Sequence, residues 1–314
     1  MKKSGVITII LLVLVDVTLS IALVVTNMHK DTKVENTDTE DVTDVNNTKK
    51  DEVAKQLDND GEVAQRAYDI VDGLGSIYGL NNGVGTYKDL TNNEILLTAY
   101  EFMDNSLIED TGFIEKRDNT VYGRFKASDL AASVKAVFGD IEYKNEDFSG
   151  RIAPVLLYVP EEDTYYRLSG VGGGGAFSYV VHGINKVEEY EDRYEVTEKM
   201  LFVKSNDLDG GTRYEIKTWS SEYSPTIAYF GSAYSYHEKD GTYYNSLDDV
   251  IEGVDDTNSI RVLMTKGSGE ALAKQIDNAQ KLLTKYAENA TELKHTFMKS
   301  EDGSFYWVKT EIVK

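Results

Sequence analysis

The chain has no cysteine among its 314 residues. This absence excludes disulfide bonds, zinc sites built on thiolates, thiol catalysis and an N-terminal cysteine that carries lipid. Secreted animal proteins commonly depend on disulfides, whereas many exported bacterial proteins fold without them. If the chain acts outside the cell, its composition therefore favours a bacterial protein.

Positive charge is also scarce. Lys and Arg number 33 against 54 Asp and Glu, which gives a formal net charge of −21 and a pI of about 4.6. Such a surface repels the phosphates of nucleic acid and the headgroups of anionic lipid, so no nucleic-acid partner is expected. A negative charge of this size favours solubility and weak cation binding, and it does not indicate the fold. Hydrophobic residues make up 41%, enough for a substantial core.

The sequence offers no catalytic, metal or nucleotide motif. Its four histidines, at positions 29, 182, 237 and 295, show no metal-ligand spacing such as four residues apart on a helix. No Gly-x-Ser-x-Gly elbow is present. The glycine run at residues 172–175 precedes a strand pattern rather than a helix, so it predicts a turn and not a phosphate-binding loop. We therefore expect no cofactor and no metal.

Two acidic features allow more than one interpretation. Residues 207–210 resemble half of a calcium loop, but Ser205 and Ile216 stand where such a loop needs acids, which favours a surface turn. The carboxylate pairs at 188–189 and 191–192 have the setting of solvated surface. A glycosidase pair that only the fold brings together stays an alternative.

The N-terminus carries a long apolar run. Residues 5–28 are almost all apolar and follow Lys2 and Lys3, which matches the length needed to cross the hydrocarbon core of a bilayer. Residues 1–28 therefore predict a membrane anchor, with the short basic tail in the cytoplasm and the rest outside. A cleaved signal peptide is the alternative, because residues 20–22 are of the size that signal peptidase accepts. Either way, the bulk of the chain is expected outside, on the membrane or secreted.

Polar residues inside this run permit a partner helix. Asp16 and Ser20 lie four residues apart and so share one helix face. The functional reading is a polar seam that binds another membrane helix. The favoured reading is a protonated Asp16 that a strongly apolar helix tolerates.

Residues 29–61 are rich in Asp, Glu, Asn, Thr and Lys and predict a flexible acidic tether. A coil of this length reaches about 30 Å, which lets a domain stand off the membrane. The folded part is expected at residues 62–314.

Helical patterns open the folded part. Apolar residues recur with helical spacing from Val63 to Ile77. Thr91 and Glu94 form the sequence of a capping box ahead of a second helix. Ser128 is expected to cap a third helix that Gly139 ends.

Strand patterns follow, and a late helix interrupts them. They cover residues 154–158, 164–168, 177–181, 186–190, 194–204, 213–219, 226–238, 243–244, 259–265, 293–299 and 305–313. Asp240-Gly241 predicts a hairpin turn, and the helix begins after Ser268. The order predicts an α+β fold with a largely antiparallel sheet, and residues 206–212 are a possible boundary between two lobes.

Two stretches resemble known proteins. Residues 125–129 (FKASD) with 134–139 (VKAVFG) resemble a segment of uncharacterised membrane-anchored extracytoplasmic proteins of Gram-positive bacteria. The closing hairpin, in which Tyr306-Trp307-Val308 follows an Asp-Gly turn, is similar to hairpins of those proteins and of cystatin-like (NTF2-like) domains. The resemblance implies location and fold, and it carries no catalytic residue.

Tyrosine is abundant, with 21 residues. Tyr234 and Tyr236 lie two apart on one expected strand, and the turn is expected to bring Tyr243 and Tyr244 beside them. Outward-facing rings would form a platform for a cell-wall glycan or a protein partner. The favoured reading is half-buried strand tyrosines with the ring inside and the hydroxyl outside.

These observations favour a non-catalytic binding or accessory domain at the cell surface, tethered to the membrane by its N-terminal helix. The alternative is a cell-envelope hydrolase whose two carboxylates meet only in the fold.

Overall fold

The computed structural model describes residues 54–76, 85–149, 155–168, 179–208, 211–219, 224–231, 242–255, 259–263 and 270–313. By its internal contacts the chain divides into two units, Met1–Lys50 and Asp51–Lys314, and every described residue belongs to the second. The expected anchor and its residues Asp16 and Ser20 lie outside the described residues. No helix in the described ranges is long and apolar enough to span a bilayer.

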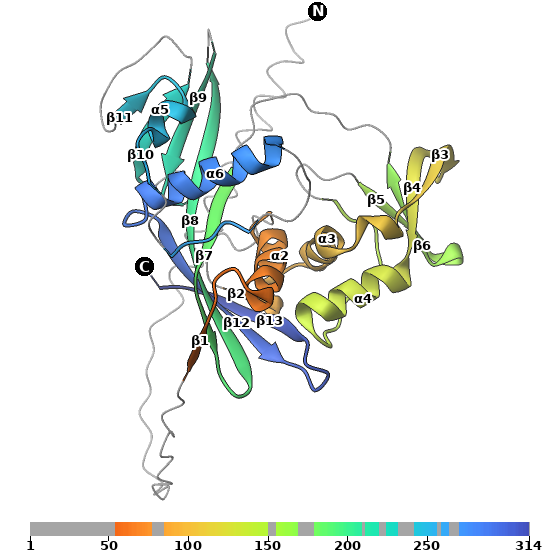
Figure 1. Ribbon diagram of the computed structural model, residues 1–314. Coiled ribbons are helices and arrows are strands. Elements are labelled where there is room, and N and C mark those ends of the chain that lie inside the picture. Colours follow the sequence, from red (N-terminus) through yellow and green to blue (C-terminus); the bar gives the residue numbers. More distant parts are fainter. Residues whose placement is uncertain are drawn as a thin grey trace, which may run out of the picture. The chain divides into compact units, whose positions relative to one another are not determined.

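The second unit is an α+β domain, as the sequence predicts (Figure 1). A large sheet runs in the order β11-β10-β9-β8-β12-β13-β2, and β7 and β1 continue from β8. Its strands are β1 (Lys55–Leu57), β2 (Gly85–Thr86), β7 (Tyr179–Glu189), β8 (Arg193–Leu208), β9 (Gly211–Lys217), β10 (Thr226–Gly231), β11 (Thr242–Tyr244), β12 (Thr291–Lys299) and β13 (Phe305–Ile312).

A second sheet has the order β3-β4-β6-β5, and all its pairs are antiparallel. Its strands are β3 (Glu109–Lys116), β4 (Asn119–Lys126), β5 (Leu156–Val159) and β6 (Thr164–Leu168). The α-helices in the described ranges are α2 (Glu62–Ser76), α3 (Asn92–Phe102), α4 (Ala127–Phe138), α5 (Leu247–Ile251) and α6 (Glu270–Lys285). Short 3₁₀ turns occur at Tyr87–Asp89, Asn105–Leu107 and Pro160–Glu162.

The helix ends show how local sequence sets these elements. The capping box before α3 is confirmed: the backbone N–H of Thr91 donates to Glu94 Oε2 at 2.7 Å, and Thr91 Oγ1 accepts from the Glu94 N–H. The start of α4 is wrong by two positions, because Lys126 is the N-cap and the side chain of Asp129 accepts its backbone N–H. Gly139 ends α4 as expected, at a φ of 74°.

The two longest strands organise the large sheet. β7 and β8 form an antiparallel ribbon from Tyr179↔Val203 to Glu189↔Tyr194. On the other edge of β8, β12 pairs with its first half and β9 with its second half, so the sheet branches there. The expected closing hairpin of β12 and β13 is confirmed.

Each half of the ribbon is covered on a different face. Around β12 and β13, the face that carries Ile184 and Val196 packs with α2, α3 and α4 in one core. Around β9 and β10, the opposite face, which carries Val181 and Leu201, packs with α5 and α6 in another core. Alternate residues of a strand point to opposite faces, so the core changes sides within a few residues of β7.

Three expectations about strands are corrected. The two strands expected at 177–181 and 186–190 are one continuous strand, β7, with an irregularity between Ile184 and Lys186. The hairpin expected from residues 226–238 to 243–244 is wrong, because β11 pairs with β10 in parallel. The strand expected at 259–265 is reduced, in residues 259–263, to an isolated bridge between Arg261 and Ile184.

Two boundaries expected from the sequence fall within strands of the large sheet. Lys55–Leu57, inside the stretch expected to be tether, pairs with the end of β7, so the folded part includes these residues. The lobe boundary considered at 206–212 falls in the β8–β9 hairpin, where Asn206↔Arg213 and Leu208↔Gly211 are paired. Residues 55–57, 206–208 and 211–212 are therefore parts of the large sheet.

Candidate ligand-binding cleft

A row of polar side chains crosses the interior of the large sheet. The register pairs His182 of β7 with Met200 of β8, and His295 of β12 with both Val196 of β8 and Thr310 of β13. Glu198 lies two residues from Met200 and two from Val196, so its side chain shares their face. His182, Glu198, His295 and Thr310 thus run diagonally over four adjacent strands.

Each neighbour in this row is hydrogen-bonded to the next. Glu198, whose side chain is 0% exposed, accepts from His182 Nδ1 at 2.9 Å and from His295 Nε2 at 2.9 Å. His295 Nδ1 lies 2.7 Å from Thr310 Oγ1, which also accepts from Trp307 Nε1 at 3.0 Å. Both oxygens of the buried carboxylate therefore have partners, which offsets much of the cost of burying it.

The row reaches the surface at helix α2. His182 Nε2 lies 3.3 Å from Oδ1 of Asp72, whose side chain is 61% exposed. The ring of Tyr68 stacks on the His182 ring at 4.4 Å between centroids, and its hydroxyl donates to the His182 carbonyl at 3.5 Å. Helix α2 thus packs against His182 at one end of the row and supplies the solvent-exposed member, Asp72.

Hydrogen bonding assigns a charge state to the row. Both ring nitrogens of His182 face carboxylate oxygens, and a carboxylate only accepts, so His182 is held as imidazolium. Burial opposes this cation, but the bonds to Asp72 and Glu198 outweigh it and raise the pKa of His182 to about 10. Burial likewise opposes the Glu198 anion, but the two histidines lower its pKa to about 2.

The edge of β7 lies beside this row. Ile184 exchanges two backbone hydrogen bonds with Arg261, at 2.8 and 2.7 Å, so its N–H and C=O point away from β8. The backbone groups of Val180 and His182 point the same way, because direction repeats every second residue. Among the described residues, no strand pairs with β7 at these two positions. They form a short edge of the sheet that no described strand covers, and the Tyr68 hydroxyl bonds to the His182 carbonyl there.

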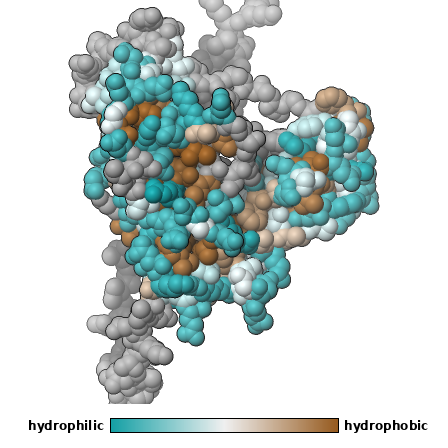
Figure 2. All heavy atoms as spheres, in the orientation of Figure 1, coloured by the Kyte–Doolittle hydropathy of each residue, from teal (hydrophilic) through white to brown (hydrophobic). Residues whose placement is uncertain are grey.

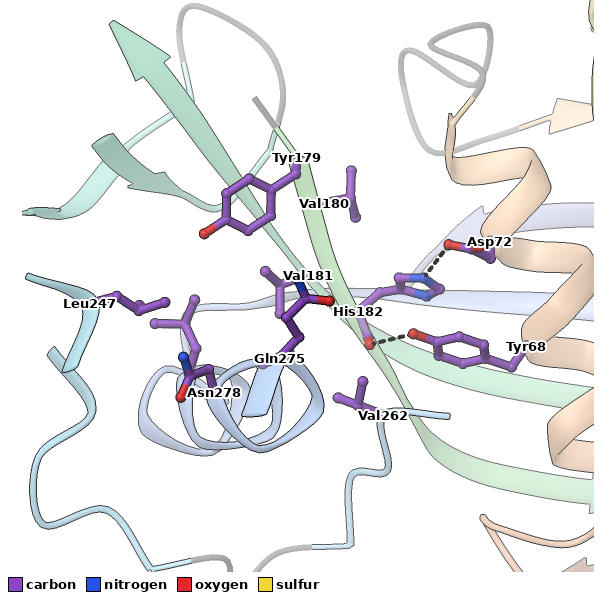
Figure 3. Close-up of a pocket in the computed structure, with 12 residues that line it drawn as sticks. Tyr68, Asp72, Tyr179, Val180, Val181, His182, Leu247, Val262, Gln275 and Asn278 are labelled. Carbon is purple, nitrogen blue, oxygen red and sulfur yellow. Dashed lines mark hydrogen bonds and ion pairs between the residues drawn. The ribbon is translucent and has the colours of Figure 1, made fainter. Parts of the chain in front are cut away.

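A cleft of about 340 Å³ lies along this edge. Tyr68 and Asp72 of α2 line one side, and Gln275, Asn278, Ala279 and Leu282 of α6 line the other, with Leu247 and Val262 nearby. Figure 3 shows His182 directed toward α2, and Tyr179 and Val181 directed toward α6. In Figure 2, apolar surface is visible between the positions that α6 and α2 occupy in Figure 1.

Gly183 fixes the geometry of this region. A Cβ at this position would lie 2.8 Å from Ile260 Cγ2 and 3.1 Å from both the Arg261 carbonyl oxygen and Leu283 Cδ1. Only glycine lets residues 259–263 and α6 approach β7 so closely. Gln280 of α6 holds the same segment, because it donates to the Ile260 carbonyl at 2.7 Å and accepts from the Val262 N–H at 3.0 Å.

The arrangement suits binding better than acid–base chemistry. A general acid at neutral pH needs a raised carboxyl pKa, whereas the pKa of Glu198 is lowered. Asp72 and Glu198 both engage the same imidazolium and so do not form a pair of acid and base. In the described ranges, no group of three His, Asp or Glu side chains is placed to hold a metal ion.

The two described tyrosines of the expected four-ring platform do not line this cleft. Tyr243 and Tyr244 belong to β11, at the edge of the large sheet, and both are half-buried. The Tyr243 hydroxyl donates to the Gly231 carbonyl, and Lys285 Nζ lies 3.2 Å from the Tyr244 hydroxyl and 4.7 Å from its ring centroid. Tyr234 and Tyr236 lie outside the described residues, so the four-ring platform stays a prediction.

Three of the four residues in the acidic pairs noted in the sequence form ion pairs. Glu189 Oε1 lies 3.0 Å from Lys299 Nζ, and Glu188 lies 2.8 Å from Lys186. Asp192 lies 3.0 Å from Arg193. In the half calcium loop, Asp207 and Leu208 of β8 pair with Thr212 and Gly211 of β9, and residues 209–210 lie outside the described ranges.

Sequence reasoning missed the buried row. Its members are 16 and 97 residues apart along the chain, so spacing alone could not join them. A weak signal was available: His182 follows Val180-Val181 and precedes Gly183-Ile184, so a polar residue stands within an apolar strand. Comparison with known protein families, with curated proteins and with solved structures finds no match to this chain.

Proposed function

We propose that the chain is a non-catalytic binding domain on the extracytoplasmic side of the membrane, and that its ligand site is the cleft along the edge of β7. The main support for this site is the cleft itself. Its walls are mainly apolar, and a few polar groups converge at one end, where Asp72 and His182 lie beside the edge of β7. Small-molecule and peptide sites in proteins commonly combine these features.

Placement at the membrane rests on the N-terminal residues. The apolar run at 5–28 has the length of a membrane helix, and the acidic stretch after it has the composition of a tether. The full-length chain is expected to fractionate with membranes and to keep its N-terminal residues. A mature chain that starts near Leu23 and is found in the medium would contradict the anchor.

The cleft is tested with a neutral apolar probe, 2-phenylethanol, and the full-length chain in detergent micelles. Saturation-transfer NMR should detect binding above that of protein-free micelles. Ala279→Phe places a ring in the cleft and should abolish the signal, whereas Ala273→Phe, on an exposed position of the same helix, should leave it unchanged. Equal signals in the two variants, with both folded by circular dichroism, would contradict this site.

A further inference from the structure

We propose that the ligand of this cleft is an extended peptide segment that adds as a strand to the edge of β7 and places a basic side chain beside Asp72. This inference rests on the proposed function and specifies the class of ligand. Strand addition to an open sheet edge is a general mode of peptide recognition, in which backbone bonds give affinity and alternate side chains give selectivity.

The edge of β7 already pairs with extended chain. Arg261 and Leu57 already pair with this edge at Ile184 and Val187, so the lower part of the edge accepts extended chain. Above them, the outward groups of Val180 and His182 continue the same line into the cleft. A segment of about three residues spans this length at the rise of a strand.

The walls of the cleft supply the side-chain preference. A strand paired with β7 points alternate side chains toward α2 and toward α6. The α6 side combines the apolar Val181, Val262 and Ala279 with the neutral amides of Gln275 and Asn278. On the α2 side stands the exposed carboxylate of Asp72. The pattern that fits is therefore a basic residue flanked by apolar residues.

The charged groups that line the α2 side of the cleft are Asp72 and His182. His295 lies deeper in the row, between Glu198 and Thr310, and does not line the cleft. Asp72 and Glu198 both bond to the imidazolium of His182, and of these two carboxylates only Asp72 lines the cleft. Among the described residues that line the cleft there is no Lys or Arg. A cationic side chain is thus favoured over an anionic one.

The test uses three capped tripeptides and the ¹⁵N-labelled full-length chain. They are acetyl-Leu-Lys-Leu-amide and the versions with Gln or Glu in place of Lys. Binding of the Lys peptide should shift the backbone amide signals of Val180 and His182. Its affinity should exceed that of the Glu peptide by roughly two- to fivefold or more, the range of a solvent-exposed ion pair. Equal or tighter binding of the Glu peptide overturns the charge preference.

Backbone pairing is tested by methylation of the Lys peptide at the Lys nitrogen or at the nitrogen of the following Leu. Alternate residues of a strand bond to the same neighbour, so one of the two methylated peptides should lose about fivefold or more in affinity. Unchanged binding of both overturns strand addition. If 2-phenylethanol binds and no peptide does, this inference fails while the proposed function stands. If neither binds, both fail.

A pair of variants on α2 assigns the charge preference to one residue. Asp72→Asn should bring the affinities of the Lys and Glu peptides together. Asp69→Asn removes the same charge one turn earlier on the helix, where Asp69 Oδ1 accepts from Gln65, and should leave the preference intact. Equal effects of the two variants would show a general charge effect and overturn the role of Asp72.

Discussion

The two faces of the β7–β8 ribbon solve the same packing problem with different side chains. On the α2 face, the core contains a charged row with a fully buried carboxylate, Glu198. On the α6 face, the ribbon contributes apolar side chains such as Val181, Leu201 and Val203. Both cores use the same two strands within a few residues of each other.

The difference shows what the buried charge does. An apolar core tolerates substitutions of similar volume, whereas a hydrogen-bonded row fixes which residue of each strand stands opposite the next. On the α2 face, Glu198 joins strand β7 to strand β12, which pair with opposite edges of β8. The row therefore specifies the register where the sheet branches. It also extends from the buried Glu198 to the exposed Asp72 at the cleft.

The largest effect should follow from loss of the central carboxylate. Glu198→Ala leaves the His182 cation without its buried partner and should lower the free energy of unfolding by about 3–5 kcal/mol. Leu201→Ala, three residues on and facing α6, should cost about 2–5 kcal/mol by leaving a cavity. Urea unfolding measures both. A loss below about 1 kcal/mol for Glu198→Ala would contradict a stabilising row.

The pH dependence of stability should distinguish the core on the α2 face, which contains the charged row, from the apolar core on the α6 face. The pKa of His182 rises from 6.5 to about 10 on folding, so its contribution is complete below pH 6.5 and declines as pH rises toward 10. The slope should approach about 1.4 kcal/mol per pH unit. The pKa of Glu198 falls from 4.5 to about 2, so its contribution is complete above pH 4.5 and is lost as pH falls toward 2.

Urea unfolding between pH 6.5 and 9 checks the alkaline side. The slope should be present in the wild type and in Leu201→Ala. It should be absent in His182→Gln, because the titrating group is gone. A slope that persists in His182→Gln would assign it to other groups.

Close approach on the α6 face gives the next effect. Gly183→Ala forces its new Cβ against Ile260, the carbonyl of Arg261 and Leu283, and should cost about 1–3 kcal/mol. Because residues 259–263 must shift, the backbone amide signals of Val180 and His182 should change too. A variant as stable as the wild type would show that this segment is not fixed against β7.

The smallest effect is expected at Thr310 of β13, and Thr296 of the neighbouring strand β12 provides the comparison. Thr310→Val removes the acceptor of Trp307 Nε1 and the partner of His295, and should cost about 1–2 kcal/mol. Thr296→Val serves as the control, because its buried hydroxyl makes no hydrogen bond in the described structure. It should be neutral or slightly stabilising. Equal losses in the two variants would contradict a specific role for Thr310.

Local sequence signals predicted much of the fold. The capping box at Thr91, the stop at Gly139 and the closing hairpin depend on neighbouring residues and were found. The hairpin of β3 and β4 was missed, because β3 is exposed along most of its length and has little apolar alternation. The parallel pairing of β10 and β11 depends on the path of the chain between them, which periodicity does not encode.

The site depended on contacts that no local pattern shows. His182, Glu198 and His295 are ordinary strand residues in the sequence, and they meet only because the registers of β7, β8 and β12 align them. The cleft needs an open strand edge and two helices from distant parts of the chain, α2 and α6. Tyrosine clustering, by contrast, is visible in the sequence, but the described tyrosines of β11 lie at the far edge of the same sheet.

The proposed role of the buried row is tested most directly by the charge state of His182, because the stability of the row and the charge of the cleft both depend on it. Ring ¹⁵N signals of the full-length chain, labelled at histidine and recorded at pH 8, report protonation of each nitrogen. Both nitrogens of His182 should be protonated and bonded to carboxylates, and Glu198→Gln should shift the Nδ1 signal. A neutral His182 with one unprotonated nitrogen at pH 8 would contradict the account.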